Sequence, residues 1–142
     1  MNPTTGETDL DRLLRSLQPV LGPEPYAFCT TTAERAAALW PAALGLFREA
    51  EGVTLILPTR AAHAAALIYE GAWAYVTLTV HSSLAAVGMI AAISTRLAQA
   101  GISLNPVAGY YHDHLFVPWE KRDLALEVLA GFGRPGGPIN DE

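Results

Sequence analysis

The spacing of apolar and polar residues changes its period in the second half of the chain. Between residues 74 and 80, apolar positions alternate with polar or aromatic ones, as expected for a strand with one buried face. From 84 to 101 the spacing becomes helical. The change falls at residues 81–83, so the sequence predicts a strand, a polar turn and an amphipathic helix in direct succession. The helix face predicted to meet the sheet consists of Leu84, Val87, Ala91, Ser94 and Ala98.

The rest of the chain divides into short elements separated by glycine and proline. Leucines at helical spacing predict a helix near the N-terminus, and Gly52 between two apolar runs predicts a β-hairpin. Pro106 lacks an N–H donor and predicts an edge strand or a bulge. The helices are expected at residues 9–17, 32–39, 60–69 and 120–130, and the other strands at 26–31, 43–50, 53–57, 102–111 and 114–117.

One short pattern occurs twice. Leu55-Ile-Leu-Pro58 and Leu115-Phe-Val-Pro118 each end a predicted hairpin and precede a predicted helix. This repeat predicts an α+β fold of two related β-α units, with antiparallel sheets that carry helices on one face. The predicted organisation is an N-terminal helix and connector (1–22), a degenerate unit (23–72), a complete-looking unit (73–132) and a flexible tail (133–142).

The second unit has no obvious last strand after Phe132. An exposed sheet edge is normally paired or covered. The strand predicted at 26–31 could cross over to this edge, or a second protomer could fill it. We favour the crossover, which interlocks the two units.

Composition narrows the class of protein and of partner. A hydrophobic fraction of 51% with 16% charged residues indicates a compact globular protein. The net charge of −5 argues against nucleic acid or an anionic membrane as partner, because both require a basic face. The single cysteine, Cys29, lies in an apolar run and is expected to be a buried thiol. Without a signal-like N-terminus or a membrane-length apolar run, the expected location is the cytoplasm.

The second half of the chain resembles a known family. The residues that carry the resemblance are Val80-His-Ser-Ser-Leu-Ala-Ala-Val-Gly88, the helix end Leu97-Ala-Gln-Ala-Gly-Ile102 and the hairpin Tyr110-Tyr-His-Asp-His-Leu-Phe-Val117. In this order they resemble small bacterial proteins with two ACT domains in tandem. The resemblance covers about residues 10 to 131 and is strongest after Ala74.

The resemblance implies both a fold and a class of function. ACT domains are ferredoxin-like βαββαβ units that bind amino acids or other small metabolites, usually between paired domains, and regulate other proteins. It therefore implies a regulatory module and not an enzyme, one that senses a free amino acid at the junction of its two units without a cofactor. It also implies homo-oligomerisation through a sheet edge or a helix face.

The predicted ligand site lies at the strand-to-helix turn, where ACT domains hold their ligands. Backbone N–H groups at a helix N-terminus attract a carboxylate, and Gly88 permits close approach of another backbone. Asp113, expected at the turn of the second hairpin, would accept hydrogen bonds from an amino group. A helix cap, a packed glycine and a turn aspartate explain the same residues without a ligand. The candidate ligand-binding residues are His81, Ser82, Ser83, Leu84, Ala85, Val87, Gly88 and Asp113.

Two other functions remain open from the sequence. A structural module without a ligand could oligomerise or dock a partner through the same sheet edge. More remotely, His112 and His114 share one face of a strand and, with His81, could hold a metal ion in an enzyme. No nucleophile motif or phosphate-binding loop is present, and Cys29 has no neighbouring base in the sequence, so no catalytic residue is predicted.

Overall fold

The computed structural model describes residues 9–80, 82–83 and 86–133, and contacts within it divide the chain into two compact units. Unit 1 consists of residues 1–22 and 75–142, and unit 2 consists of residues 23–74. Strand β5 (Ile68–Leu78) contributes its first part to unit 2 and its last part to unit 1. Unit 2 is therefore inserted between the two segments that form unit 1.

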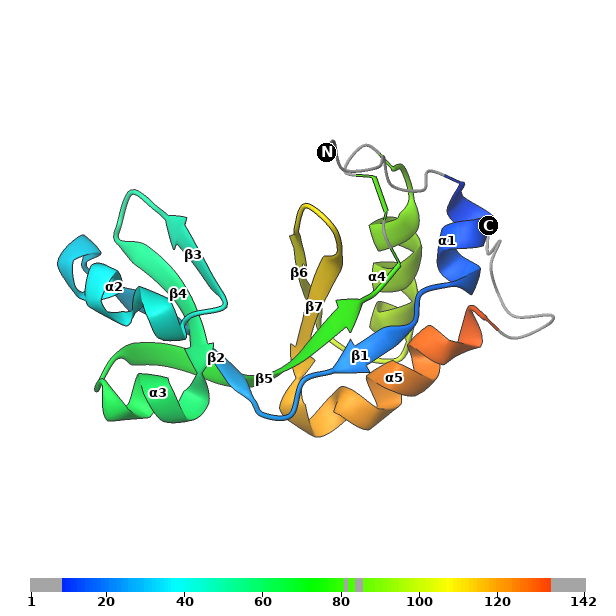
Figure 1. The fold of residues 1–142 in the computed structure, drawn as a ribbon. Coiled ribbons are helices and arrows are strands. Elements are labelled where there is room, and N and C mark those ends of the chain that lie inside the picture. Colours follow the sequence, from blue (N-terminus) through cyan, green and yellow to red (C-terminus); the bar gives the residue numbers. More distant parts are fainter. Residues whose placement is uncertain (1–8, 81, 84–85, 134–142) are drawn as a thin grey trace. The chain divides into compact units, whose positions relative to one another are not determined.

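Unit 1 has the strand order β1-β5-β7-β6. Helices α4 and α5 pack against each other, and α5 also contacts β1 and β7 (Figure 1). The buried residues of α4 are Met89, Ile93 and Leu97, which recur every four residues and so form one stripe. The elements of unit 1 are α1 (Leu10–Arg15), β1 (Pro19–Leu21), the end of β5, α4 (Met89–Gln99), β6 (Asn105–Ala108), β7 (Asp113–Pro118), η2 (Trp119–Lys121) and α5 (Arg122–Gly131).

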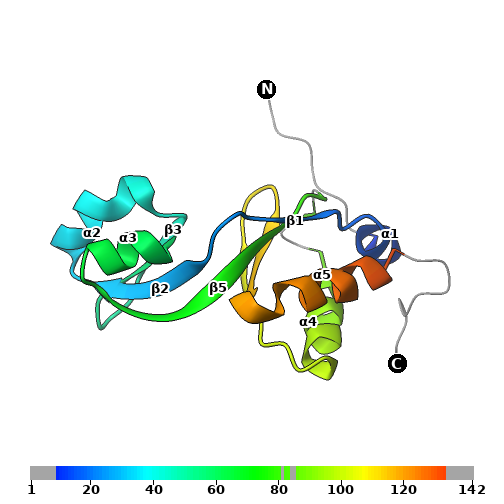
Figure 2. The same cartoon turned by 90° about the horizontal axis from the view of Figure 1, so that it is seen from below.

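Unit 2 has the strand order β3-β4-β2-β5, and all three of its strand pairs are antiparallel. Helices α2 and α3 lie on the same side of this sheet, as Figure 2 shows from below. They cover a core to which β2 and β4 contribute alternate residues, including Cys29, Leu55 and Leu57. The elements of unit 2 are β2 (Tyr26–Thr31), α2 (Ala33–Leu39), η1 (Trp40–Ala42), β3 (Gly45–Arg48), β4 (Val53–Pro58), α3 (Thr59–Ala64) and the start of β5.

Several predictions from the sequence are confirmed. The hairpin around Gly52 forms between β3 and β4, with Glu49 and Gly52 joined by backbone hydrogen bonds. Both copies of the repeat end a strand at proline, since β4 ends at Pro58 and β7 at Pro118, and a helix follows each. Pro106 lies on β6, at the edge of its sheet. Cys29 is buried, and burial raises the pKa of its thiol.

The strand that fills the open edge of unit 1 was predicted wrongly. The segment 26–31 stays in unit 2, where β2 pairs with β4 and with β5. The crossing strand is instead β1, three residues that pair antiparallel with Val76, Thr77 and Leu78 of β5. A three-residue strand that begins with proline shows no alternation, so its sequence gave no sign of pairing. Proline is tolerated at the first residue of an edge strand.

Three further boundaries differ from those expected. Helix α4 starts at Met89 and not near Leu84, because Gly88 has a left-handed φ of 95°, which a right-handed helix cannot include. Its buried stripe is accordingly not the predicted one, and Ala91 and Ala98 are exposed. The predicted helix 60–69 ends at Ala64, and β5 begins at Ile68 instead of Ala74. Alanine-rich sequence favours helix weakly, and strand pairing with β2 outweighs that preference here.

Candidate functional site

Four of the predicted ligand-binding residues line one hollow in unit 1. This hollow, which we call the α4 hollow, has a volume of about 180 Å³ and lies at the N-terminus of α4. Ser82, Ser83, Gly88 and Asp113 contribute to its wall, together with Ala108 and the first residues of α4. The fold thus brings Asp113 to the strand-to-helix segment that precedes it by about thirty residues.

Asp113 and Ser82 form a direct polar pair. The Ser82 hydroxyl donates to Oδ2 of Asp113 over 3.0 Å, and the two residues are only 7% and 9% exposed. Asp113 is the first residue of β7, where it pairs with Ala108 of β6, and does not lie at the hairpin turn as predicted. A buried carboxylate is costly unless it accepts hydrogen bonds, so Ser82 helps to hold this charge beside the hollow.

The N-terminus of α4 has no side-chain cap. Its N-cap residue is Gly88, which has no side chain to accept a hydrogen bond from the first turn. The first N–H groups of a helix have no partner within the helix and carry partial positive charge. A hollow lined by the start of this helix and by a buried carboxylate suits a molecule with both a negative and a positive group.

Gly109 closes the hollow from the β6–β7 hairpin. Its N–H donates to the carbonyl oxygen of His112 over 2.9 Å. A Cβ atom at this position would lie 2.9 Å from that same oxygen, so the hairpin requires glycine here. Sequence reasoning missed both Gly109 and Ala108 as wall residues. The glycine just before the Tyr110-Tyr111 pair was the available signal, but hairpin register was needed to place it.

The remaining predicted site residues are placed differently. His81, Leu84 and Ala85 lie outside the described residues. Val87 is 83% exposed and is not part of the wall of the α4 hollow.

The two described histidines of the metal hypothesis each hydrogen-bond to unit 1. Nδ1 of His114 lies 3.1 Å from both the Tyr75 and the Thr77 hydroxyl groups, and Nδ1 of His112 lies 3.3 Å from the Val80 carbonyl oxygen. Burial lowers the pKa of His114, and the neighbouring His112 lowers it further. Within residues 9–80, 82–83 and 86–133, no group of three or more His, Cys, Asp or Glu side chains is placed to hold a metal ion.

Comparison with known proteins identifies the family. Two sequence profiles of the ACT domain match this chain, one over residues 5–74 and the other over 71–131. A Vibrio cholerae protein of unknown function, described as a possible transport protein, is 43% identical, with a TM-score of 0.79 over 89% of this chain and 98% of that one. The chain belongs to the ACT-domain family. ACT domains are typically regulatory modules that bind amino acids, and this chain carries two of them in tandem.

More distant solved structures share the ACT fold. A protein from Agrobacterium tumefaciens has a TM-score of 0.61 at 20% identity, over 78% of this chain and 84% of that one. The regulatory subunit of aspartate kinase from Thermus flavus has a TM-score of 0.61 at 10% identity, over 82% of this chain and 97% of that one. No functionally curated protein matches the sequence significantly. No helix in the described ranges has the length and apolar character needed to cross a bilayer.

Proposed function

We propose that this ACT-domain protein is a regulatory module that senses a free amino acid, and that the α4 hollow holds part of the ligand. The observation that carries the proposal is the meeting of an uncapped helix N-terminus with the buried Ser82–Asp113 pair in one hollow. The ligand's α-carboxylate would accept hydrogen bonds from N–H groups of the first turn of α4. Its ammonium group would donate to Asp113.

The size of the hollow favours a small amino acid or the main-chain part of a larger one. Its volume of about 180 Å³ lies below the range of about 300–1,000 Å³ that is usual for small-molecule sites. One solved protein of the same fold is a regulatory subunit of aspartate kinase. A regulatory and non-catalytic role is therefore part of the proposal.

Thermal-shift measurements with each proteinogenic amino acid test this function. A ligand that binds only the folded state raises stability with the logarithm of its concentration. We expect a shift with at least one small amino acid, and we expect Asp113→Asn to abolish it. Asp123→Asn is the matched control, because Asp123 is an exposed carboxylate of α5 outside the hollow. If no amino acid raises the melting temperature at millimolar concentration, the proposal in its amino-acid form is wrong.

A second candidate function, self-association without a ligand, is favoured by the edge strand β3. This strand ends the sheet of unit 2 and carries no proline, and its Phe47 is 71% exposed. An unblocked apolar edge strand is a template for pairing with another chain. Light scattering of the wild type and of Phe47→Asp would test it: we expect a dimer that the variant dissociates, and a monomeric wild type would refute it.

A further inference from the structure

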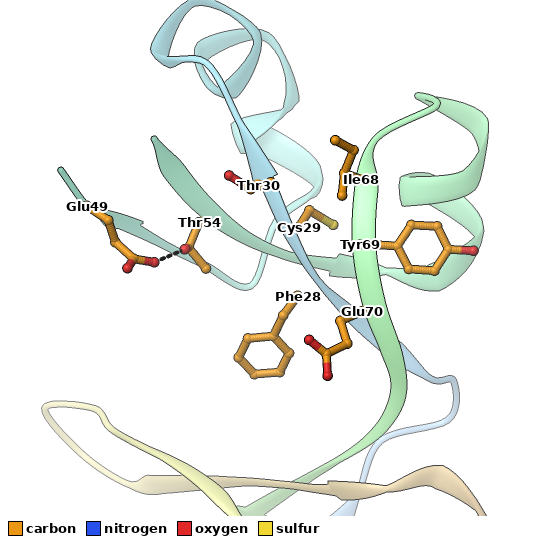
Figure 3. Close-up of a pocket in the computed structure, with 8 residues that line it drawn as sticks. All are labelled: Phe28, Cys29, Thr30, Glu49, Thr54, Ile68, Tyr69 and Glu70. Atoms are coloured by element: carbon orange, nitrogen blue, oxygen red, sulfur yellow. Dashed lines mark hydrogen bonds between the residues drawn. The ribbon is translucent and has the colours of Figure 1, made fainter. Parts of the chain in front are cut away.

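A second hollow lies in unit 2, away from the side that the helices cover. We call it the sheet hollow; its volume is about 590 Å³ (Figure 3). The core beneath α2 and α3 takes Cys29 and Leu55. Because side chains alternate along a strand, Phe28, Thr30 and Thr54 project from the opposite face. All residues that line the sheet hollow belong to unit 2.

The floor of the sheet hollow is formed by residues paired directly across three strands. Thr30 of β2 pairs with Thr54 of β4 on one side and with Ile68 of β5 on the other. Phe28 pairs with Glu70 in the neighbouring row. Ile68 is 77% exposed and Phe28 is half-buried, so the floor exposes an apolar surface beside the paired threonines Thr30 and Thr54. Such a surface favours an aliphatic chain.

Two carboxylates border this floor, Glu49 from the β3–β4 turn and Glu70 from β5. The Glu49 side chain accepts a hydrogen bond from the Thr54 hydroxyl of β4, and Glu70 belongs to β5. Figure 3 shows Glu49 with Thr54 on one side of the hollow, and Glu70 next to the Phe28 ring on the other. Since β4 and β5 both neighbour β2, they lie two strand spacings apart, about 10 Å.

Neither carboxylate is neutralised by the protein. Within the described residues, no lysine, arginine or histidine forms an ion pair with Glu49 or Glu70, whereas Glu24 of the same unit is paired with Arg60. The whole chain carries a net charge of −5, which adds to the attraction for a cation. The sheet hollow thus combines two separated negative charges with an apolar floor between them.

We propose that the sheet hollow binds an aliphatic diamine, with one ammonium group at Glu49, the other at Glu70 and the alkyl chain over Phe28 and Ile68. The Phe28 ring face can add cation–π attraction to the ammonium group beside Glu70. This site is separate from the α4 hollow and does not depend on amino-acid binding there. It would give the module a second ligand, a dication, beside the amino acid proposed for the α4 hollow.

Titration calorimetry with putrescine on the full chain tests this inference. We expect binding that weakens about fivefold in Glu70→Gln and in Glu49→Gln, as the loss of one exposed ion pair implies. Glu51→Gln is the matched control, because Glu51 lies on the same β3–β4 turn but does not line the hollow. Glu70 is exposed, so Glu70→Gln should fold normally, which an unchanged melting temperature would verify.

Two further ligands separate the proposed geometry from general attraction to an acidic protein. Butylamine carries one charge and should bind at least about fivefold more weakly than putrescine. Free lysine carries an α-carboxylate that the two glutamates repel, so it should also bind more weakly. Equal affinity of putrescine for Glu70→Gln and Glu51→Gln, equal affinity of butylamine, or no heat at millimolar putrescine would overturn the inference. Asp113→Asn should leave putrescine binding unchanged, so this result and that of the amino-acid test are independent.

Discussion

The two units share a topology but differ in the connection between the first strand and the first helix. In unit 2 the single residue Thr32 connects β2 to α2, and its side chain accepts a hydrogen bond from the N–H of Arg35 over 3.2 Å. In unit 1 the residues 79–88 separate β5 from α4, and Gly88 leaves the helix without a side-chain cap. In unit 2 the Thr32 side chain thus caps an N–H group at the start of the first helix, whereas in unit 1 the start of the corresponding helix lines the α4 hollow.

The two units also differ at the first residue of the strand that ends in proline, β4 in unit 2 and β7 in unit 1. Strands β4 and β7 both have six residues and end in proline, so Val53 and Asp113 occupy equivalent first positions. Val53 lines a mainly apolar hollow that also includes Arg48, whereas Asp113 lines the α4 hollow and accepts a hydrogen bond from Ser82. The comparison teaches that the fold alone requires no polar pair here. This supports a functional reason for the pair in unit 1.

Substitutions at the first residues of β4 and β7 should have the largest effect on stability. Val53→Asp places a carboxylate at a buried position, where Arg48, its cross-strand neighbour, can compensate only part of the cost, so we expect a loss of about 2–3 kcal/mol in the free energy of unfolding. Asp113→Val leaves the buried Ser82 hydroxyl without its acceptor and should cost about 1–2 kcal/mol. Chemical denaturation measures both.

Val53→Thr is the control for this exchange, since it nearly keeps the shape of valine and brings no charge. It should cost clearly less than Val53→Asp. If Val53→Asp is tolerated as well as Val53→Thr, position 53 can hold a carboxylate with no partner other than Arg48. In that case the difference between Val53 and Asp113 does not argue for a functional role of the Ser82–Asp113 pair.

The left-handed conformation at Gly88 gives the next largest effect. Gly88→Ala forces an L-residue to a φ of 95°, which should cost about 1–2 kcal/mol, and the new Cβ would also lie 3.2 Å from the Leu10 side chain. Gly131→Ala is the matched control, because Gly131 is helical and a Cβ there meets nothing within 4 Å. Denaturation should show the control to be neutral or slightly more stable. Equal effects of both substitutions would contradict the strain at Gly88.

Much of this architecture follows from the sequence, because strand and helix periods are local properties. The Leu55 and Leu115 repeats located both inner strands and the helices after them, and the β3–β4 hairpin followed from Gly52. The pairing of Pro19–Leu21 with β5 could not be predicted, since it depends on an edge that forms more than fifty residues later in the chain. Long-range pairing of a short strand leaves no local pattern.

The candidate site was predicted in part for the same reason. Ser82, Ser83, Gly88 and Asp113 were chosen from a polar turn and a resemblance, and the fold brings them to one hollow. Whether they bind a ligand stays a prediction. The sheet hollow was not predicted, because its carboxylates come from a turn and from the position just after the predicted helix 60–69. Glu70 acquires its place only through the register of β5 with β2.

Removal of the cap in unit 2 should have a smaller effect than the strain at Gly88. Thr32→Ala deletes the acceptor for the Arg35 N–H and should cost about 1 kcal/mol of unfolding free energy. Thr32→Ser retains the acceptor and should restore most of the loss. If Thr32→Ala abolishes an amino-acid response that Thr32→Ser retains, the helix end in unit 2 takes part in ligand binding, and the division of roles between the units is wrong.

The smallest effect should be a pH dependence confined to unit 1. His114 of β7 and Thr54 of β4 are equivalent second residues of their strands, so only unit 1 carries a titrating group there. Burial lowers the pKa of His114 in the folded state below the ordinary value of 6.5, despite the opposing charge of Asp113. At pH values between the folded-state pKa of His114 and 6.5, the unfolded chain binds more protons than the folded chain. The contribution of His114 to stability is therefore complete above pH 6.5 and is lost as the pH falls through the folded-state pKa. Amide hydrogen exchange at neutral pH and near pH 5 should show faster opening of β7 than of β4 at the lower pH. In His114→Gln, whose side-chain amide can also hydrogen-bond to Tyr75 and Thr77, this difference should disappear; if it persists, another group in unit 1 is responsible.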